Sequence, residues 1–317
     1  MSSIGGLVGD RSRACPLPVI CGPTASGKSA LALRLAESVR ASIISADSRQ
    51  VYRGFDIGTA KPDADERRRV PHYGIDVVAP DEPYTAAHWA AAVPDWLEQI
   101  RAEGRKPVIV GGTGFYLRAL FVPLFEEPPM DPGRRAAIRS LLSGMSTEEI
   151  RRWSAALDPA RAVLGRAQRE RAIEVALVTG RRISDLHLDR PRASTLTARY
   201  LVLDPGMSLS GSIASRVDAM LAAGWLDEVR SLVERVDPEA RAWTATGYDV
   251  MRRVVTGELT LEKGRELVVI ATRQYAKRQR TWFRHQLEGE RVLRLDPRAA
   301  DTFDRAVAWF NSEEVQR

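Results

Sequence analysis

Short apolar runs alternate with longer segments of helical spacing along the first part of the chain. The short runs predict buried strands, at residues 17–22, 41–48 and 106–111. The longer segments predict helices, at residues 29–40, at 85–103 and from 115 onward. Strands that alternate with helices at this spacing predict an α/β fold built on a parallel sheet.

The segment 85–103 carries its own start and stop signals. Thr85 is placed to cap the N-terminus of this helix, and Gly104 is placed to end it. Pro94 lies in the middle and is expected to bend or interrupt the helix, because proline removes a backbone hydrogen bond.

The pattern changes after the Pro-rich segment EEPPMDP. Residues 126–198 are rich in arginine and nearly free of β-runs, which predicts a helical insertion. A β-run at 198–205 is expected to rejoin the sheet, followed by mainly helical residues 210–285, an edge strand at 291–296 and a terminal helix at 300–312. The expected organisation is a disordered leader (1–16), a core in two parts (17–125 and 199–317) and the insertion between them (126–198).

Composition narrows the class of protein without identifying it. The 317 residues are 44% hydrophobic and 28% charged, as in soluble globular proteins, and no apolar run is long enough for a membrane span. The two cysteines, Cys15 and Cys21, form no disulfide framework, and the scattered histidines have no metal-ligand spacing. A cytoplasmic location is therefore expected. The net charge of +6 favours an anionic partner.

Three chemically distinctive segments follow predicted strands. They are residues 22–29, Asp47 and the turn Gly111–Thr113. Ligands of open α/β sheets bind outside the carboxyl ends of the strands, so one pocket is expected to contain all three segments.

The first of these segments matches the P-loop pattern G-x-x-x-x-G-K-[ST] and lies between a predicted strand and a predicted helix. Backbone N–H groups and the helix N-terminus bind phosphate oxygens in such loops. Lys28 is expected to reach the terminal phosphate, and Ser29 to hold Mg²⁺. The predicted phosphate-binding residues are Gly22, Pro23, Thr24, Ala25, Ser26, Gly27, Lys28 and Ser29.

A P-loop does not by itself specify the reaction. The N-K-x-D motif that specifies guanine in GTPases is absent from the sequence. Asp47 fits two roles equally well on position alone. It could coordinate Mg²⁺ as a Walker-B acid, or it could act as a general base that removes a proton from an acceptor.

A second informative segment is the predicted helix at 265–285. At about 100° per residue, four cations fall within roughly 60° of one another, and apolar positions occupy the opposite side. The cations are Arg273, Lys277, Arg280 and Arg284, and the apolar positions are Val268, Ala271, Tyr275 and Trp282. We expect the basic face to point outward and to bind a phosphate backbone, although an ordinary solvated face is the plainer alternative. Gln274, Arg278 and Gln279 flank the stripe and could hydrogen-bond to bases.

Several segments together resemble the tRNA dimethylallyltransferase family, also called isopentenyl-diphosphate:tRNA transferases. The matching stretches occur in the family's order across residues 17–290. They are GPTASGKS (22–29), ISADSRQVYRGFDIGTAKP (44–62), PVIVGGTGFYLRAL (107–120), RAIEV…TG (171–180), SRVDAMLAAGWLDEV (215–229) and TRQYAKRQRTWF (272–283).

The resemblance implies a fold and a reaction. The fold is a P-loop NTPase-like parallel sheet core with a helical insertion domain. The reaction moves a dimethylallyl group from dimethylallyl diphosphate to N6 of the adenosine 3′-adjacent to the anticodon (A37), giving N6-dimethylallyladenosine. The P-loop then holds a diphosphate rather than ATP, with Mg²⁺ as cofactor. The insertion grips the anticodon stem-loop of tRNA, and the enzyme is expected to be a monomer.

The resemblance also assigns roles to residues. Asp47 matches the general base, which favours that role over Walker B. Lys28 and Thr113 match residues beside the diphosphate, and Arg216 matches an arginine that neutralises the leaving group, with a surface ion pair as its alternative. The residues that match tRNA contacts are Asp47, Ser48, Arg49, Gln50, Arg169, Arg171, Gly247, Tyr248, Thr272, Arg273, Gln274, Lys277, Arg278 and Gln279.

The sequence departs from the family pattern at two places. Gln168 stands where an arginine is usual, so Arg169 is expected to substitute for it. Asp249 follows Gly247 and Tyr248 where a cation is usual, and it is left out of the predicted site because it would repel phosphate. Two other functions compete with this interpretation. They are a P-loop kinase of a small metabolite and a non-catalytic RNA-binding protein with a nucleotide switch.

Overall fold

The computed structural model describes residues 15–122, 130–188, 196–206 and 209–312. The chain divides into two compact units, one formed by residues 1–121 and 195–317 and the other by residues 122–194. Most of the expected leader (1–14) and the start of the expected insertion (126–129) lie outside the described residues.

The larger unit is built on a six-stranded sheet in which every pair of neighbouring strands is parallel. Its order is β3-β2-β4-β1-β5-β6. The strands are β1 (Leu17–Cys21), β2 (Ala41–Ser45), β3 (His72–Tyr73), β4 (Lys106–Gly111), β5 (Ala198–Leu203) and β6 (Val292–Leu295). The predicted parallel α/β sheet is confirmed, with β6 at its edge. Of the six strands, β3 is the one that was not predicted, because a strand of two residues has no periodicity in the sequence.

Helices cover both faces of this sheet. On one face, side chains of α1 (Lys28–Val39) and α13 (Thr302–Asn311) pack against every second side chain of the strands. They form one hydrophobic cluster that includes Ile20, Leu201 and Phe310. On the other face, α3 (Ala86–Ala102) and α4 (Gly114–Phe121) pack against each other and against the strands. These two layers fix the positions of the loops that leave the strands.

The α3 helix runs through Pro94 as one continuous helix, so of the two expected effects, a bend or an interruption, the interruption is wrong. The Thr85 hydroxyl accepts a hydrogen bond from the His88 N–H at 3.1 Å, which confirms the predicted cap. Proline inside a helix costs about 3 kcal/mol. The buried side chains of Trp89, Val93 and Leu97 contribute about 1.5–3 kcal/mol each, which is enough to keep the helix continuous.

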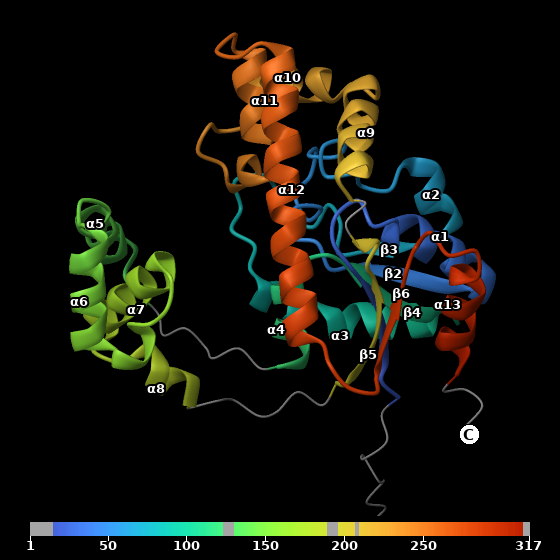
Figure 1. The fold of residues 1–317 in the computed structure, drawn as a ribbon, viewed down its shortest axis with the longest axis horizontal. Helices are drawn as coiled ribbons and strands as arrows, with labels where there is room; N and C mark the ends of the chain where they lie inside the picture. Colours follow the sequence, from blue (N-terminus) through green and yellow to red (C-terminus); the bar gives the residue numbers. More distant parts are fainter. Residues whose placement is uncertain (1–14, 123–129, 189–195, 207–208, 313–317) are drawn as a thin grey trace, which may run out of the picture. The chain divides into compact units, whose positions relative to one another are not determined.

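The remaining helices of this unit lie beyond the carboxyl ends of the strands (Figure 1). They are α2 (Ala64–Arg69), α9 (Leu209–Ala222), α10 (Trp225–Arg235), α11 (Tyr248–Val255) and the long α12 (Leu261–Gln286). Among the described helices, none is both long and apolar enough to cross a membrane.

The smaller unit is helical, with α5 (Pro132–Ser143), α6 (Thr147–Leu157), α7 (Arg166–Thr179) and α8 (Ile183–Leu188). Leu142, Ile150 and Ile173 form part of its core. Glu174 on α7 is buried and is paired with Arg135, Arg139 and Arg171. A buried carboxylate needs such partners, and the pairs with Arg135 and Arg139 link α7 to α5.

Candidate active site

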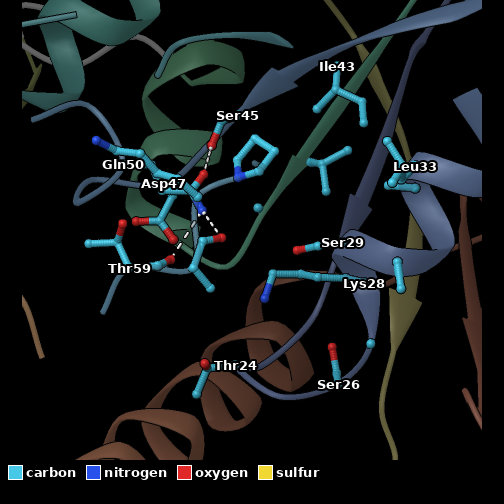
Figure 2. Close-up of a pocket in the computed structure, with 18 of the residues that line it drawn as sticks. Thr24, Ser26, Lys28, Ser29, Leu33, Ile43, Ser45, Asp47, Gln50 and Thr59 are labelled. Atoms are coloured by element: carbon cyan, nitrogen blue, oxygen red, sulfur yellow. Dashed lines mark hydrogen bonds between the residues drawn. The ribbon is translucent and has the colours of Figure 1, made fainter. Parts of the chain in front are cut away.

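Two adjoining cavities open at the carboxyl edge of the sheet. The first, the P-loop cavity, has a volume of about 400 Å³ and is lined by the P-loop, Asp47 and Gly111 (Figure 2). The second, the adjoining cavity, has a volume of about 380 Å³ and is lined by Asp47–Arg49, Thr113 and α12 residues. The predicted convergence of the three loops is confirmed. The residues that line both cavities are Thr24, Asp47, Thr59, Arg216 and Tyr275.

The P-loop has the backbone geometry of an anion cradle. Ala25 (φ 60°) and Gly27 (φ 79°) adopt left-handed conformations that turn the chain into α1, which begins at Lys28. At Gly22, a side chain would strike the carbonyl oxygen of Leu203 on β5, so the close approach of loop and sheet requires glycine. Successive N–H groups and the N-terminus of α1 are then directed at one site.

Charge in the P-loop cavity favours an anion. Burial, together with the charge of Arg216, lowers the pKa of Lys28 to about 8, and the carboxylate of Asp47 opposes this shift. Burial also lowers the pKa of Arg216, again opposed by Asp47. Arg216 lines both cavities and forms no ion pair with any carboxylate of the described residues. The alternative role of Arg216, a salt bridge on the surface of its helix, is therefore wrong. Two poorly solvated cations and one carboxylate leave room for a multiply charged anion.

Asp47 lies two residues beyond the end of β2, opposite Lys28 and Ser29 across the P-loop cavity (Figure 2). Its Oδ1 atom accepts a hydrogen bond from the Arg49 N–H at 2.8 Å, which orients the carboxylate. The Thr113 hydroxyl accepts from the Ser48 N–H at 3.3 Å, and the Thr113 N–H donates to the Ala46 carbonyl at 3.3 Å. Asp47 and Thr113 are therefore held together where the two cavities meet.

The side chain of Gln279 does not face outward from α12. It is only 7% exposed, its Oε1 accepts from the Thr24 N–H at 2.8 Å, and its Nε2 donates to the Gly112 carbonyl at 2.8 Å. The expectation that Gln279 hydrogen-bonds to tRNA bases is wrong, because backbone groups already use both ends of its amide. Gln279 instead ties α12 to the P-loop and to the turn after β4.

Replacing Gln279 by Glu is expected to destabilise the fold by about 1–3 kcal/mol, because a carboxylate cannot donate to the Gly112 carbonyl. The added negative charge beside Thr24 is also expected to weaken binding of inorganic pyrophosphate. Urea denaturation and pyrophosphate titration measure the two effects. Gln286→Glu, at the exposed end of the same helix, is the matched control. Unfolding free energies equal to wild type would contradict this role.

The basic stripe on α12 is largely as predicted. Arg273, Lys277 and Arg284 are exposed, as is Gln274 beside them. Arg280 is the exception, because its side chain turns toward Asp204, with 3.0 Å between Nε and Oδ1, and is 21% exposed. Helix geometry places the Cα atoms of the four cations on one face, but a carboxylate after β5 draws the Arg280 guanidinium inward.

The other predicted tRNA contacts fall into separate groups. Ser48, Arg49, Thr272 and Arg278 line the adjoining cavity, and Gln50 lines the P-loop cavity. In the smaller unit, Arg169 is half-buried on α7, and Arg171 is paired with Glu174.

Gly247 and Tyr248 are part of the core and do not form a contact surface. Both are buried, and Gly247 (φ 94°) packs against Trp225. The Tyr248 hydroxyl accepts from the Gly58 N–H at 3.0 Å and donates to Glu228 at 2.5 Å. The expectation that these two residues contact tRNA is wrong, because their surfaces are already packed against the protein.

Sequence reasoning missed two residues at the junction of the cavities. Tyr275 was assigned to the apolar face of α12, yet it lines both cavities beside Asp47 and Thr113. Thr59 also lines both cavities. Both residues could have been found from their place in segments that match the family, because Tyr275 lies inside TRQYAKRQRTWF and Thr59 lies inside ISADSRQVYRGFDIGTAKP.

The oxygen atoms around the P-loop suit a hard divalent cation. The Ser29 hydroxyl and the Asp47 carboxylate line the same cavity, and Mg²⁺ prefers such ligands together with phosphate oxygens and water. Across 15–122, 130–188, 196–206 and 209–312, no three His, Cys, Asp or Glu side chains gather as a metal site. Ser29 is the residue that would hold a cation beside phosphate oxygens of a bound ligand.

Known proteins resemble this chain over most of its length. A family model described as IPP transferase matches residues 50–286, and one described as isopentenyl transferase matches residues 16–72. A protein of Anaeromyxobacter sp. (strain K) named tRNA dimethylallyltransferase is 42% identical over 276 residues, covering 85% of this chain and 90% of that protein. A protein of the same name from Deinococcus radiodurans is 40% identical over 285 residues, covering 87% and 92%.

Solved structures show the same architecture. The full-length tRNA isopentenylpyrophosphate transferase from Bacillus halodurans has a TM-score of 0.65 and 30% identity, covering 95% of this chain and 96% of that chain. A eukaryotic dimethylallyltransferase described as acting on tRNA has a TM-score of 0.76 and 26% identity, covering 96% and 80%.

Proposed function

The chain belongs to the IPP transferase family, and on that premise we propose that it transfers a dimethylallyl group from dimethylallyl diphosphate to N6 of A37 in tRNA. The observation that carries this proposal is the pair of adjoining cavities. One is built on a P-loop, the other opens beside it, and Asp47, Arg216 and Tyr275 line both. This is the arrangement that a group transfer between a diphosphate donor and a bulky acceptor requires.

The donor diphosphate binds in the P-loop cavity. Backbone N–H groups of residues 27–29 and the Lys28 ammonium meet its charge, and Arg216 faces it from α9. These groups stabilise the charge that grows on the diphosphate as its C1–O bond breaks. An allylic carbon tolerates positive charge, so positioning contributes more than activation of the nucleophile.

The acceptor adenine enters the adjoining cavity. The base must leave its stack to reach Asp47, which is the geometry of base flipping. As the N6–C1 bond forms and the C1–O bond breaks, the Asp47 carboxylate takes the N6 proton and the diphosphate leaves. Thr113, held against the loop of Asp47, lies beside the reacting atoms. Mg²⁺ bound by Ser29 and the diphosphate would supply further charge neutralisation.

The rest of the tRNA is proposed to lie against the basic stripe on α12. Arg273, Lys277 and Arg284 on α12 supply phosphate contacts, and Arg278 lines the adjoining cavity beneath them. We propose that the smaller unit, with Arg169, grips the anticodon stem-loop. The enzyme is proposed to act as a monomer and in the cytoplasm, where its tRNA substrate is found.

Transfer of labelled dimethylallyl diphosphate to unmodified tRNA tests the function directly. Label at the adenosine 3′ to the anticodon is the expected result. ATP consumption without RNA, and no label in tRNA, would establish the small-metabolite kinase instead. Binding of tRNA without transfer, gated by a nucleotide, would establish the RNA-binding switch.

Diphosphate binding is expected to take up a proton above pH 8. The empty site holds Lys28 with a pKa of about 8, and an anion beside it raises that pKa again. Above this pH the complex therefore binds more protons than the free protein, and the association constant falls as the pH rises. Calorimetry of pyrophosphate binding in buffers of different ionisation enthalpy measures the uptake, at about pH 9 against about pH 7. Uptake that persists in Lys28→Met would assign the proton to another group.

A further inference from the structure

One loop forms a wall of both cavities. Residues 56–62 connect the Asp47 segment to α2, and Thr59 lines both cavities. Gly58 lines only the adjoining cavity, whereas Ala60, Lys61 and Pro62 line only the P-loop cavity. The shape of each cavity therefore depends on a different half of this loop.

The first half is held by two side chains from outside it. The Glu228 carboxylate on α10 accepts hydrogen bonds from the Asp56 N–H at 3.1 Å and the Ile57 N–H at 2.8 Å. The Tyr248 hydroxyl on α11 accepts from the Gly58 N–H at 3.0 Å. The same hydroxyl donates to Glu228 at 2.5 Å, so the two side chains and three consecutive backbone N–H groups form one network.

Close packing also restrains the first half. Gly58 lies flat against Trp225 and Tyr248, and a side chain at this position would overlap both rings. The Phe55 ring, just before the network, contacts Tyr248 in a tilted arrangement at 4.8 Å between centroids and Trp243 edge-on at 5.3 Å. Burial raises the pKa of Tyr248, as does the neighbouring Glu228 charge, so the phenol stays protonated and can donate.

The second half has separate supports. Gln50 Nε2 donates to the carbonyls of Thr59 and Ala60 at 3.2 and 3.0 Å. Lys61 is almost completely buried, and its ammonium binds the Tyr52 carbonyl at 2.5 Å and the carboxylates of Asp56 and Asp76 at 2.6 Å each. Lys61 also ties this half to Asp56 in the first half, so only the contacts with Gln50, Tyr52 and Asp76 are independent of Glu228 and Tyr248.

We propose that Glu228 and Tyr248 are positioning residues that set the acceptor side of the site, by fixing the backbone of residues 56–58 against the adjoining cavity. This inference rests on the proposed function, since it gives the adjoining cavity to the acceptor RNA. Neither side chain touches substrate. Glu228 acts through the N–H groups of Asp56 and Ile57, and Tyr248 acts through that of Gly58, whereas the donor side has further anchors at Gln50 and Asp76.

Tyr248→Phe and Glu228→Ala are expected to weaken binding of an unmodified anticodon stem-loop RNA about five- to tenfold, because each leaves buried groups without partners. Affinity for inorganic pyrophosphate is expected to stay within about twofold of wild type. Glu228→Gln still accepts from the backbone N–H groups, so it is expected to restore most of the RNA affinity. Hydrogen exchange at residues 56–58 is expected to speed up in Tyr248→Phe and Glu228→Ala.

Matched controls separate positioning from general damage. Tyr73→Phe removes a surface hydroxyl that donates to Glu103, and Glu234→Gln changes the exposed face of α10. Both are expected to behave as wild type. Equal losses of RNA and pyrophosphate affinity in Tyr248→Phe would overturn the inference, as would unchanged RNA affinity. Wild-type protein that binds the stem-loop without transferring label would overturn the proposed function, and the affinity ratios of the variants would still decide the inference.

Discussion

Replacing Asp47 by Asn is expected to reduce kcat for transfer about 10²- to 10⁴-fold, the usual contribution of a positioned general base. An asparagine oxygen can still accept the hydrogen bond from the Arg49 N–H, so the loop should keep its geometry. Only the group that takes the N6 proton is lost. Affinity for pyrophosphate is expected to equal or exceed that of wild type, because a negative charge facing Lys28 has been removed.

This combination distinguishes the two roles that the sequence left open for Asp47. If Asp47 coordinated Mg²⁺ as a Walker-B acid, the variant would bind pyrophosphate more weakly in the presence of Mg²⁺. Single-turnover transfer and pyrophosphate titration, with and without Mg²⁺, measure both quantities. Asp249→Asn, an exposed carboxylate on α11, controls for the change of charge. Wild-type kcat in Asp47→Asn would exclude the base assignment.

The fold was predictable where local signals coincide with tertiary packing. The runs at 17–22 and 106–111 are short, apolar and followed by glycines, and they form β1 and β4. The P-loop lies between a strand and a helix, as its motif requires, so its place at the sheet edge followed from the sequence. An interruption at Pro94 does not occur, because the burial of Trp89, Val93 and Leu97, which only the folded chain supplies, outweighs the local cost of proline.

The site was predictable as a set of segments but not in the direction of every side chain. Gln279 and Tyr248 occupy positions that match family motifs, yet both face inward to hydrogen-bond backbone groups far along the chain. A helical wheel places Arg280 with Arg273 and Lys277, but it does not contain Asp204. Tyr275 was assigned to the core for the same reason, since the cavity that it lines exists only once α12 packs beside Asp47.

Replacing Arg216 by Gln is expected to lower kcat for transfer about 10²- to 10³-fold, because a preorganised cation no longer meets the charge on the departing diphosphate. The half-buried Arg216 lines both cavities, and its only electrostatic partners among the described residues are Asp47 and Lys28. Arg216→Lys keeps a charge but not the planar donor group, and it is expected to recover only part of the rate.

The Arg216→Gln substitution is also expected to change a binding property that can be measured without the transfer reaction. The charge of Arg216 is one cause of the low pKa of Lys28, so Arg216→Gln is expected to raise that pKa. The pH at which pyrophosphate binding begins to take up a proton should then move above 8, in the direction of the ordinary lysine value. Arg230→Gln, which removes an exposed arginine from α10, should leave both the rate and this pH unchanged. A slower enzyme with an unshifted proton uptake would place Arg216 near the leaving group but away from Lys28. An unchanged rate would remove it from the reaction.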